Sequence, residues 1–135
     1  MKKALLSLES IMLLAPLTAA LCYTTVLTLL VGLPASVMQQ LDPGEGYDLF
    51  LPLSATGNIA GVYAVVVLWS LAVSTIQGKR YVFTRKFGWG VGAGIYASAC
   101  LVAIYGWPAL VFGVMPPVVV GAHFVFLQRA RRVNA

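Results

Sequence analysis

His123 is the only histidine of the chain, and it lies inside a long apolar stretch, about one turn before the polar C-terminal end. Ionisable side chains within a membrane are costly and mark candidate functional sites. Glu9, at the start of the first apolar stretch, is the nearest acid in depth, so a contact between His123 and Glu9 is geometrically possible. The alternative is a histidine near the membrane surface that bonds a backbone carbonyl.

Three further residues inside apolar stretches are candidates for a polar path or a hinge. Pro116 and Pro117 lie in the middle of the last stretch. Proline lacks a backbone donor and clashes with the preceding turn, so the pair predicts a kink or a break in a helix. Broken helices often line binding sites in membranes, although a plain kink is the alternative. Asn58, with hydroxyl side chains nearby, predicts hydrogen bonds between helices.

An acidic segment is the third candidate. Asp42, Glu45 and Asp48 lie within seven residues around a strong turn signal. Three carboxylates so close together could attract a cation or a basic partner, but their spacing does not match a calcium loop of the EF-hand type. The alternative is a solvated loop whose charge fixes the membrane topology. We therefore predict no metal site.

Sequence motifs for catalysis are missing. The chain has no HExxH, Walker or GxSxG motif and no paired carboxylates. The glycine-rich segment 88–92 lies in an apolar stretch, which is the wrong context for a nucleotide-binding turn. One histidine cannot supply the two axial ligands of a bis-histidine haem. We predict that the protein is not an enzyme and holds no cofactor.

The elements that position these residues are predicted to be membrane helices. The chain is 60% hydrophobic and 10% charged, whereas soluble domains carry about a quarter charged residues. Crossing a bilayer takes about 20 apolar residues, and uncharged stretches give spans of about 11–33 and 53–77. The third uncharged stretch, 87–128, would extend about 63 Å as one helix. We expect it to fold back at residues 106–108, giving spans of about 87–105 and 109–127.

The distribution of charge predicts the orientation. All nine lysines and arginines lie on one side of a four-span arrangement, at the N-terminus, in the turn 78–86 and at the C-terminus. Positive residues favour the cytoplasmic side, so both termini and the turn 78–86 are predicted there, and the acidic loop of about 34–52 lies outside. The fold class is thus an all-α integral membrane protein, a four-transmembrane-helix bundle, with residues 1–135 as one domain in a bacterial inner membrane. Basic residues at the edges of apolar stretches make nucleic acid an unlikely partner and the lipid bilayer the expected one.

Small residues predict where helices pack. Gly57 and Gly61 form one GxxxG motif in the second span, and Gly90 and Gly94 form another in the third. Such residues let helix backbones approach closely. We expect the second and third spans to pack tightly, either within one chain or between subunits.

Three functions remain open. The first is an accessory, assembly or protective protein that packs against a membrane partner through its helices. The second is a homo-oligomeric transporter or channel for a small solute or ion, with the broken fourth helix and His123 along its path. The third, a membrane-embedded enzyme or cofactor carrier, would depend on the lone histidine.

Overall fold

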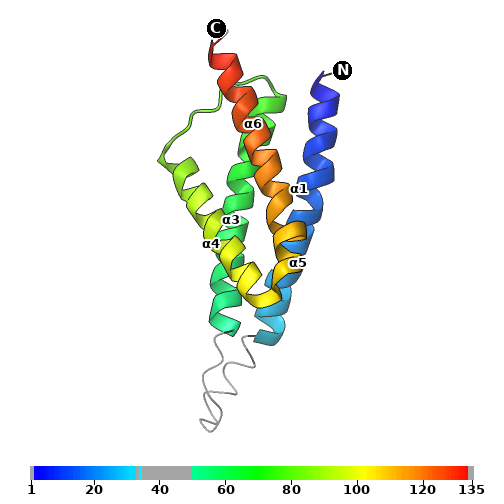
Figure 1. Ribbon diagram of the computed structural model, residues 1–135, viewed down its shortest axis with the longest axis vertical. Coiled ribbons are helices and arrows are strands. Elements are labelled where there is room, and N and C mark those ends of the chain that lie inside the picture. Colours follow the sequence, from blue (N-terminus) through cyan, green and yellow to red (C-terminus); the bar gives the residue numbers. More distant parts are fainter. Residues whose placement is uncertain (1, 33, 35–49, 134–135) are drawn as a thin grey trace.

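The structure is a computed structural model that describes residues 2–32, 34 and 50–133. These residues are almost entirely helical, with no strand among them (Figure 1). Three helices are long and apolar enough to cross a membrane, over Ala4–Leu30, Pro52–Ile76 and Arg85–Tyr105. The predictions of an all-α fold and of the first three spans are confirmed at this level.

The first helix, α1 (Lys2–Leu27), continues into a short π-helical segment, η1 (Thr28–Gly32). It begins before the predicted span of 11–33, because hydropathy marks where the apolar stretch begins and not where the backbone becomes helical. Lysine, alanine, leucine and glutamate, which fill the first turns, are all good helix formers. Pro16 lies inside α1 without ending it.

The helix α3 (Phe50–Ile76) is the centre of the molecule. It packs against α1 on one side and against α6 on another, and its most extensive contact is with α4 (Arg85–Tyr105). Figure 1 shows α4 inclined away from α6 at the end where α4 begins. As a result, α4 depends mainly on α3 for its place in the bundle.

A glycine ends α4. Gly106 has a φ of 70°, a conformation that residues with a Cβ rarely adopt, and it lies between α4 and the short helix α5 (Trp107–Ala109). The predicted bend at residues 106–108 is therefore confirmed. After α5 the chain continues through a π-helical segment, η2 (Leu110–Val114), into α6 (Met115–Val133), which returns along α1 and α3.

A kink or a break was predicted at Pro116 and Pro117, and the structure shows no break of the helical backbone there. Both prolines lie in the first turn of α6, and the backbone stays helical on both sides of them. The irregularity in this helical segment is the wider π-helical turn of η2, which lies immediately before the two prolines. A widened turn moves the preceding carbonyls away from the proline rings and accommodates the missing backbone donors.

The fourth predicted span, 109–127, is helical but is not among the three helices that meet the length and hydropathy of a membrane span. Its apolar residues are divided between η2 and α6. In addition, α6 ends with Arg129, Arg131 and Arg132, which lower its average hydropathy.

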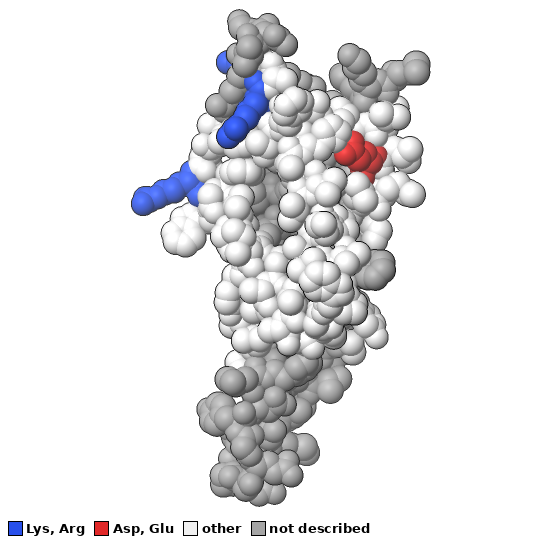
Figure 2. Space-filling view, viewed as in Figure 1, with Lys and Arg blue, Asp and Glu red and all other residues white. Residues whose placement is uncertain are grey.

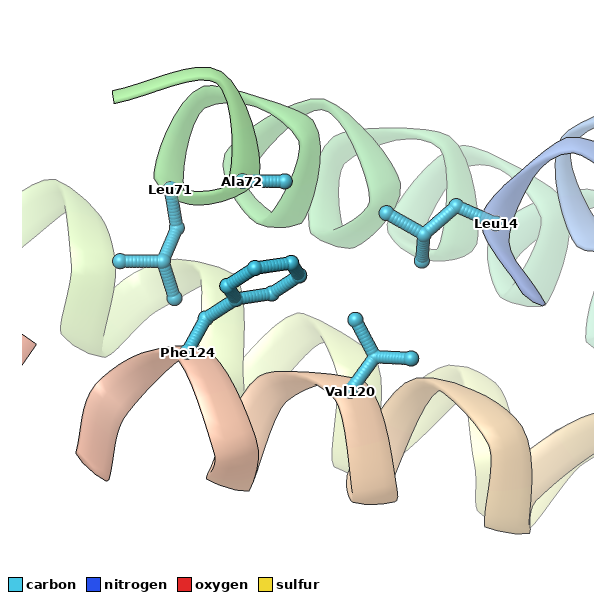
Figure 3. Packing of buried hydrophobic residues seen from close by; sticks show 5 residues of the cluster. All are labelled: Leu14, Leu71, Ala72, Val120 and Phe124. Carbon is cyan, nitrogen blue, oxygen red and sulfur yellow. The ribbon is translucent and has the colours of Figure 1, made fainter. Parts of the chain in front are cut away.

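The core lies near the end of the molecule that holds both termini. Phe124 and Val120 of α6 point toward Leu14 of α1 and Leu71 of α3, as Figure 3 shows, and all four side chains are fully buried. The aromatic side chains of the turn between α3 and α4 pack against this cluster. The core therefore joins α1, α3 and α6 and leaves most of α4 outside it.

Charged side chains gather at the same end. Figure 2 shows Lys and Arg toward one edge of this end, an acidic patch at the opposite edge and an uncharged surface below them. The turn between α3 and α4, the start of α1 and the end of α6 meet there (Figure 1). One end of the described molecule is thus basic, and the body is apolar.

Candidate functional site

His123 and Glu9 form a pair between α6 and α1. The Nδ1 atom of His123 lies 2.6 Å from Oε1 of Glu9. The two side chains are 41% and 23% exposed, so the pair lies at the edge of the helix bundle and not in its core. The His123 ring is stacked beside the ring of Phe124, with their planes 11° apart. Because Phe124 is fully buried, the backbone that carries His123 is firmly placed.

This pair can do two things. A protonated His123 forms a salt bridge with Glu9, whereas a neutral His123 can donate its Nδ1 proton to the carboxylate as a hydrogen bond. In both states the pair holds α6 against α1, and charge-assisted hydrogen bonds are stronger than neutral ones. Imidazole and carboxylate are also groups that pass protons to one another in proteins, so the pair is chemically suited to proton transfer.

Asn58 lies in a polar seam between α1 and α3. Thr24 donates a hydrogen bond to Oδ1 of Asn58 at 2.9 Å, and the Asn58 amide donates to Thr28 at 3.0 Å. The Thr28 hydroxyl is also 3.1 Å from that of Ser54. These bonds satisfy Asn58 within the chain, so its first role is to join the two helices.

Asn58 and Pro116 line the same cavity. It measures about 490 Å³ and is lined by residues of α1, α3, α4 and the segment from Ala109 to Pro116. His123 and Glu9 do not line it. The structure thus brings together two of the five predicted polar and hinge residues, pairs His123 with Glu9 elsewhere, and places Pro117 in the lining of a different cavity.

The four glycines of the GxxxG motifs face neighbours within the chain. A Cβ on Gly57 would lie 2.8 Å from Cβ of Cys100, and one on Gly90 would lie 2.8 Å from the Val67 side chain. A Cβ on Gly61 would likewise contact Leu21 and Ala97, and one on Gly94 would contact Ala64. These glycines allow α3 and α4 to approach closely, so their faces are already occupied.

Gln128 is a polar residue that the sequence analysis missed. Its side chain is almost completely buried, and its amide nitrogen donates to the hydroxyl of Thr75 at 3.0 Å and to the carbonyl of Lys79 at 3.1 Å. Its amide oxygen accepts from the backbone N–H of Tyr81 at 3.2 Å. Gln128 therefore fastens the turn after α3 onto α6. The available signal was a neutral amide next to Arg129, at the end of an apolar stretch.

Three aromatic rings support the same turn. Tyr81, Phe83 and Phe87 contact one another edge to face, with ring centroids 4.9 to 5.9 Å apart. Burial raises the pKa of Tyr81 above its ordinary value of 10.0, with a further contribution from Tyr63, so the hydroxyl is neutral at physiological pH. The basic residues of the turn are thus carried on a fixed scaffold.

The remaining predicted site cannot be placed. Asp42, Glu45 and Asp48 lie outside the described residues. Within the described ranges there is no group of three histidine, cysteine or acidic side chains that could hold a metal ion.

Comparisons with protein-family models, with curated proteins and with solved structures give no match to this chain.

Proposed function

We propose that the protein crosses a bacterial inner membrane four times, with both termini in the cytoplasm, and acts as an accessory or assembly subunit for another membrane protein. The helical segment from Trp107 to Val133 supports a fourth crossing, because it returns beside α1 and α3. The common position of both termini and the basic turn at one end supports the orientation (Figure 1).

The observation that carries the accessory role is an open face of small residues on α4. Gly88 and Gly92 are exposed, and a Cβ on either would have no neighbour within 4 Å. Ala99 and Ala103 are also exposed, farther along α4, and the exposed side chains of Ile95 and Tyr96 lie between the two small pairs. Small residues at this spacing allow a second helix to pack closely in a membrane. The two GxxxG faces are used inside the chain, whereas the Gly88/Gly92 pair of α4 remains open to a partner.

Bulky substitutions on this face test the proposal. Gly88→Leu with Gly92→Leu should remove a partner that co-purifies with the wild-type protein in mild detergent at one-to-one stoichiometry. Ala15→Leu with Ala19→Leu is a matched control, since these two exposed residues have the same spacing on α1. The control should keep the partner. A wild-type protein that purifies only as a homo-oligomer, without any second protein, would contradict the accessory role.

A second function, a homo-oligomeric transporter or channel, is favoured by the exposed His123–Glu9 pair. The pair can exchange a proton, and the cavity beside Asn58 and Pro116 offers space for a small solute. In proteoliposomes with a pH gradient, wild-type protein should then carry protons, and His123→Ala or Glu9→Gln should lower the flux by about 100-fold or more, the usual contribution of a positioned acid–base group. Phe126→Ala, an exposed neighbour on α6, is the control that should keep the flux. No flux from the wild-type protein would exclude proton transport.

A further inference from the structure

An apolar cleft separates α4 from α6 on the surface of α3. It has a volume of about 630 Å³, within the range of about 300–1,000 Å³ typical of ligand pockets. Phe87, Val91 and Ile95 line the α4 wall, and Val118, Ala122 and Val125 line the α6 wall. Figure 2 shows the surface hollowed below the basic end. The cleft is therefore an apolar site that opens at the side of the helix bundle.

Basic residues lie at one end of this cleft. Arg85 and Lys86 directly precede Phe87 on α4, and Arg129 lies one turn beyond Val125 on α6. All three are exposed, and the turn that precedes Arg85 is fastened to α6 through the Lys79 carbonyl and Gln128. Glu9, the only acid among the described residues, is paired with His123 at the α1–α6 contact. One end of the cleft thus borders the basic end of the molecule.

The shape and lining of the cleft suit an extended apolar occupant. From Phe87 to Leu101 its wall extends about 21 Å along α4. A single hydrocarbon chain needs no hydrogen-bond partners from these apolar walls, and its head group would lie at the end of the cleft that borders the basic residues.

We propose that the cleft binds one acyl chain of an anionic phospholipid, whose phosphate group contacts Arg85, Lys86 and Arg129. An apolar cleft that borders basic residues at one end matches a lipid with an apolar tail and a negative head group. The proposal depends on the chain crossing a bilayer and is independent of the proposed protein partner.

Native mass spectrometry with two lipids of identical acyl chains tests this site. Purified wild-type protein should retain one phosphatidylglycerol molecule in preference to phosphatidylcholine. Arg85→Gln with Lys86→Gln should lower that preference by about 30-fold, from the usual effect of two basic residues at an anionic surface. Lys2→Gln with Lys3→Gln removes two charges from α1 instead and should leave the preference unchanged.

Filling the cleft should remove the lipid whatever its head group. Ala122→Phe and Val91→Phe add bulk from opposite walls, and Ala103→Phe adds the same ring on the outer face of α4 as a control. Both cleft variants should lose both lipids, and the control should keep them. Equal retention by all three variants would overturn the proposal, as would a wild-type protein without preference for phosphatidylglycerol. A cross-link from residue 122 to a second protein chain would also overturn it.

Discussion

Gln128 shows how one neutral side chain fixes a turn at the basic end of the molecule. Its three hydrogen bonds reach α3 and the backbone on both sides of Arg80. Among the described residues, no buried side-chain nitrogen or oxygen lacks a hydrogen-bond partner. Such complete pairing is expected in an apolar bundle, because an unpaired polar group there has no water to bind.

At this scale we predict that Gln128→Leu loosens the turn between α3 and α4. Losing three hydrogen bonds should cost about 2 kcal/mol, since each contributes about 0.6 kcal/mol within membrane proteins. Trypsin should then cleave at Lys79 and Arg80 faster than in the wild-type protein in detergent. Gln77→Leu, at an exposed position of the same turn, is the matched control and should be cleaved at the wild-type rate. Equal rates for both variants would show that Gln128 does not hold the turn.

The sequence predicted some of these residues better than others. The contact between His123 and Glu9 was expected as a possibility because both residues have the same depth in their apolar stretches. Gln128 was missed because depth alone does not show which way an amide faces. Asn58 was expected to bond between helices, but its partners on α1 depend on the rotation of both helices, which hydropathy does not determine.

At the scale of elements, α4 has three different faces. Gly90, Ala97 and Cys100 are buried. Val91 and Ile95 line the cleft, whereas Gly88 and Gly92 are open. The alternation of glycines along residues 88–94 explains this division, because Gly90 and Gly94 lie on one side of the helix and Gly88 and Gly92 on another. The sequence indicated small residues for packing but could not assign the two sets to different neighbours.

We predict opposite results for alanine at two neighbouring glycines. Gly90→Ala should destabilise the protein by about 1–3 kcal/mol, the usual cost of overpacking, because the new Cβ would lie 2.8 Å from Val67. Gly92→Ala has open space and should be neutral or slightly stabilising, since alanine is the better helix former. Reversible unfolding in mixed micelles measures both. A loss of stability in Gly92→Ala equal to that in Gly90→Ala would contradict the assignment of the two faces.

At the scale of the whole molecule, the basic end is the feature that relates the fold to a membrane. The start of α1, the turn after α3 and the end of α6 meet there, so one surface collects the positive residues of three distant segments. Charge counting predicted this arrangement, because lysine and arginine positions follow directly from the sequence. The tilt of α4 within the bundle was not predictable from the sequence, because it depends on how the glycines of α4 pack against the side chains of α3.

We predict that a fluorescent protein fused after Ala135 is fluorescent in bacterial cells and that alkaline phosphatase at the same position is inactive. Four crossings with a cytoplasmic N-terminus return the C-terminus to the cytoplasm, where only the fluorescent protein matures. The same two reporters inserted within residues 34–52 should give the opposite result, with active alkaline phosphatase and no fluorescence. Active phosphatase after Ala135 would require an odd number of crossings and would contradict the four-span arrangement.

The separation of Glu9 and His123 by 114 positions has a consequence for biosynthesis. The contacts of α3 with α1 and with α4 join helices that follow one another in the chain. These contacts can form as soon as each helix has been synthesised. Glu9 cannot meet its histidine until almost the whole chain has been translated. A nascent chain truncated before α6 should therefore hold a Glu9 carboxylate without its histidine partner, and membrane quality-control proteases would have a means of distinguishing unfinished chains from complete ones.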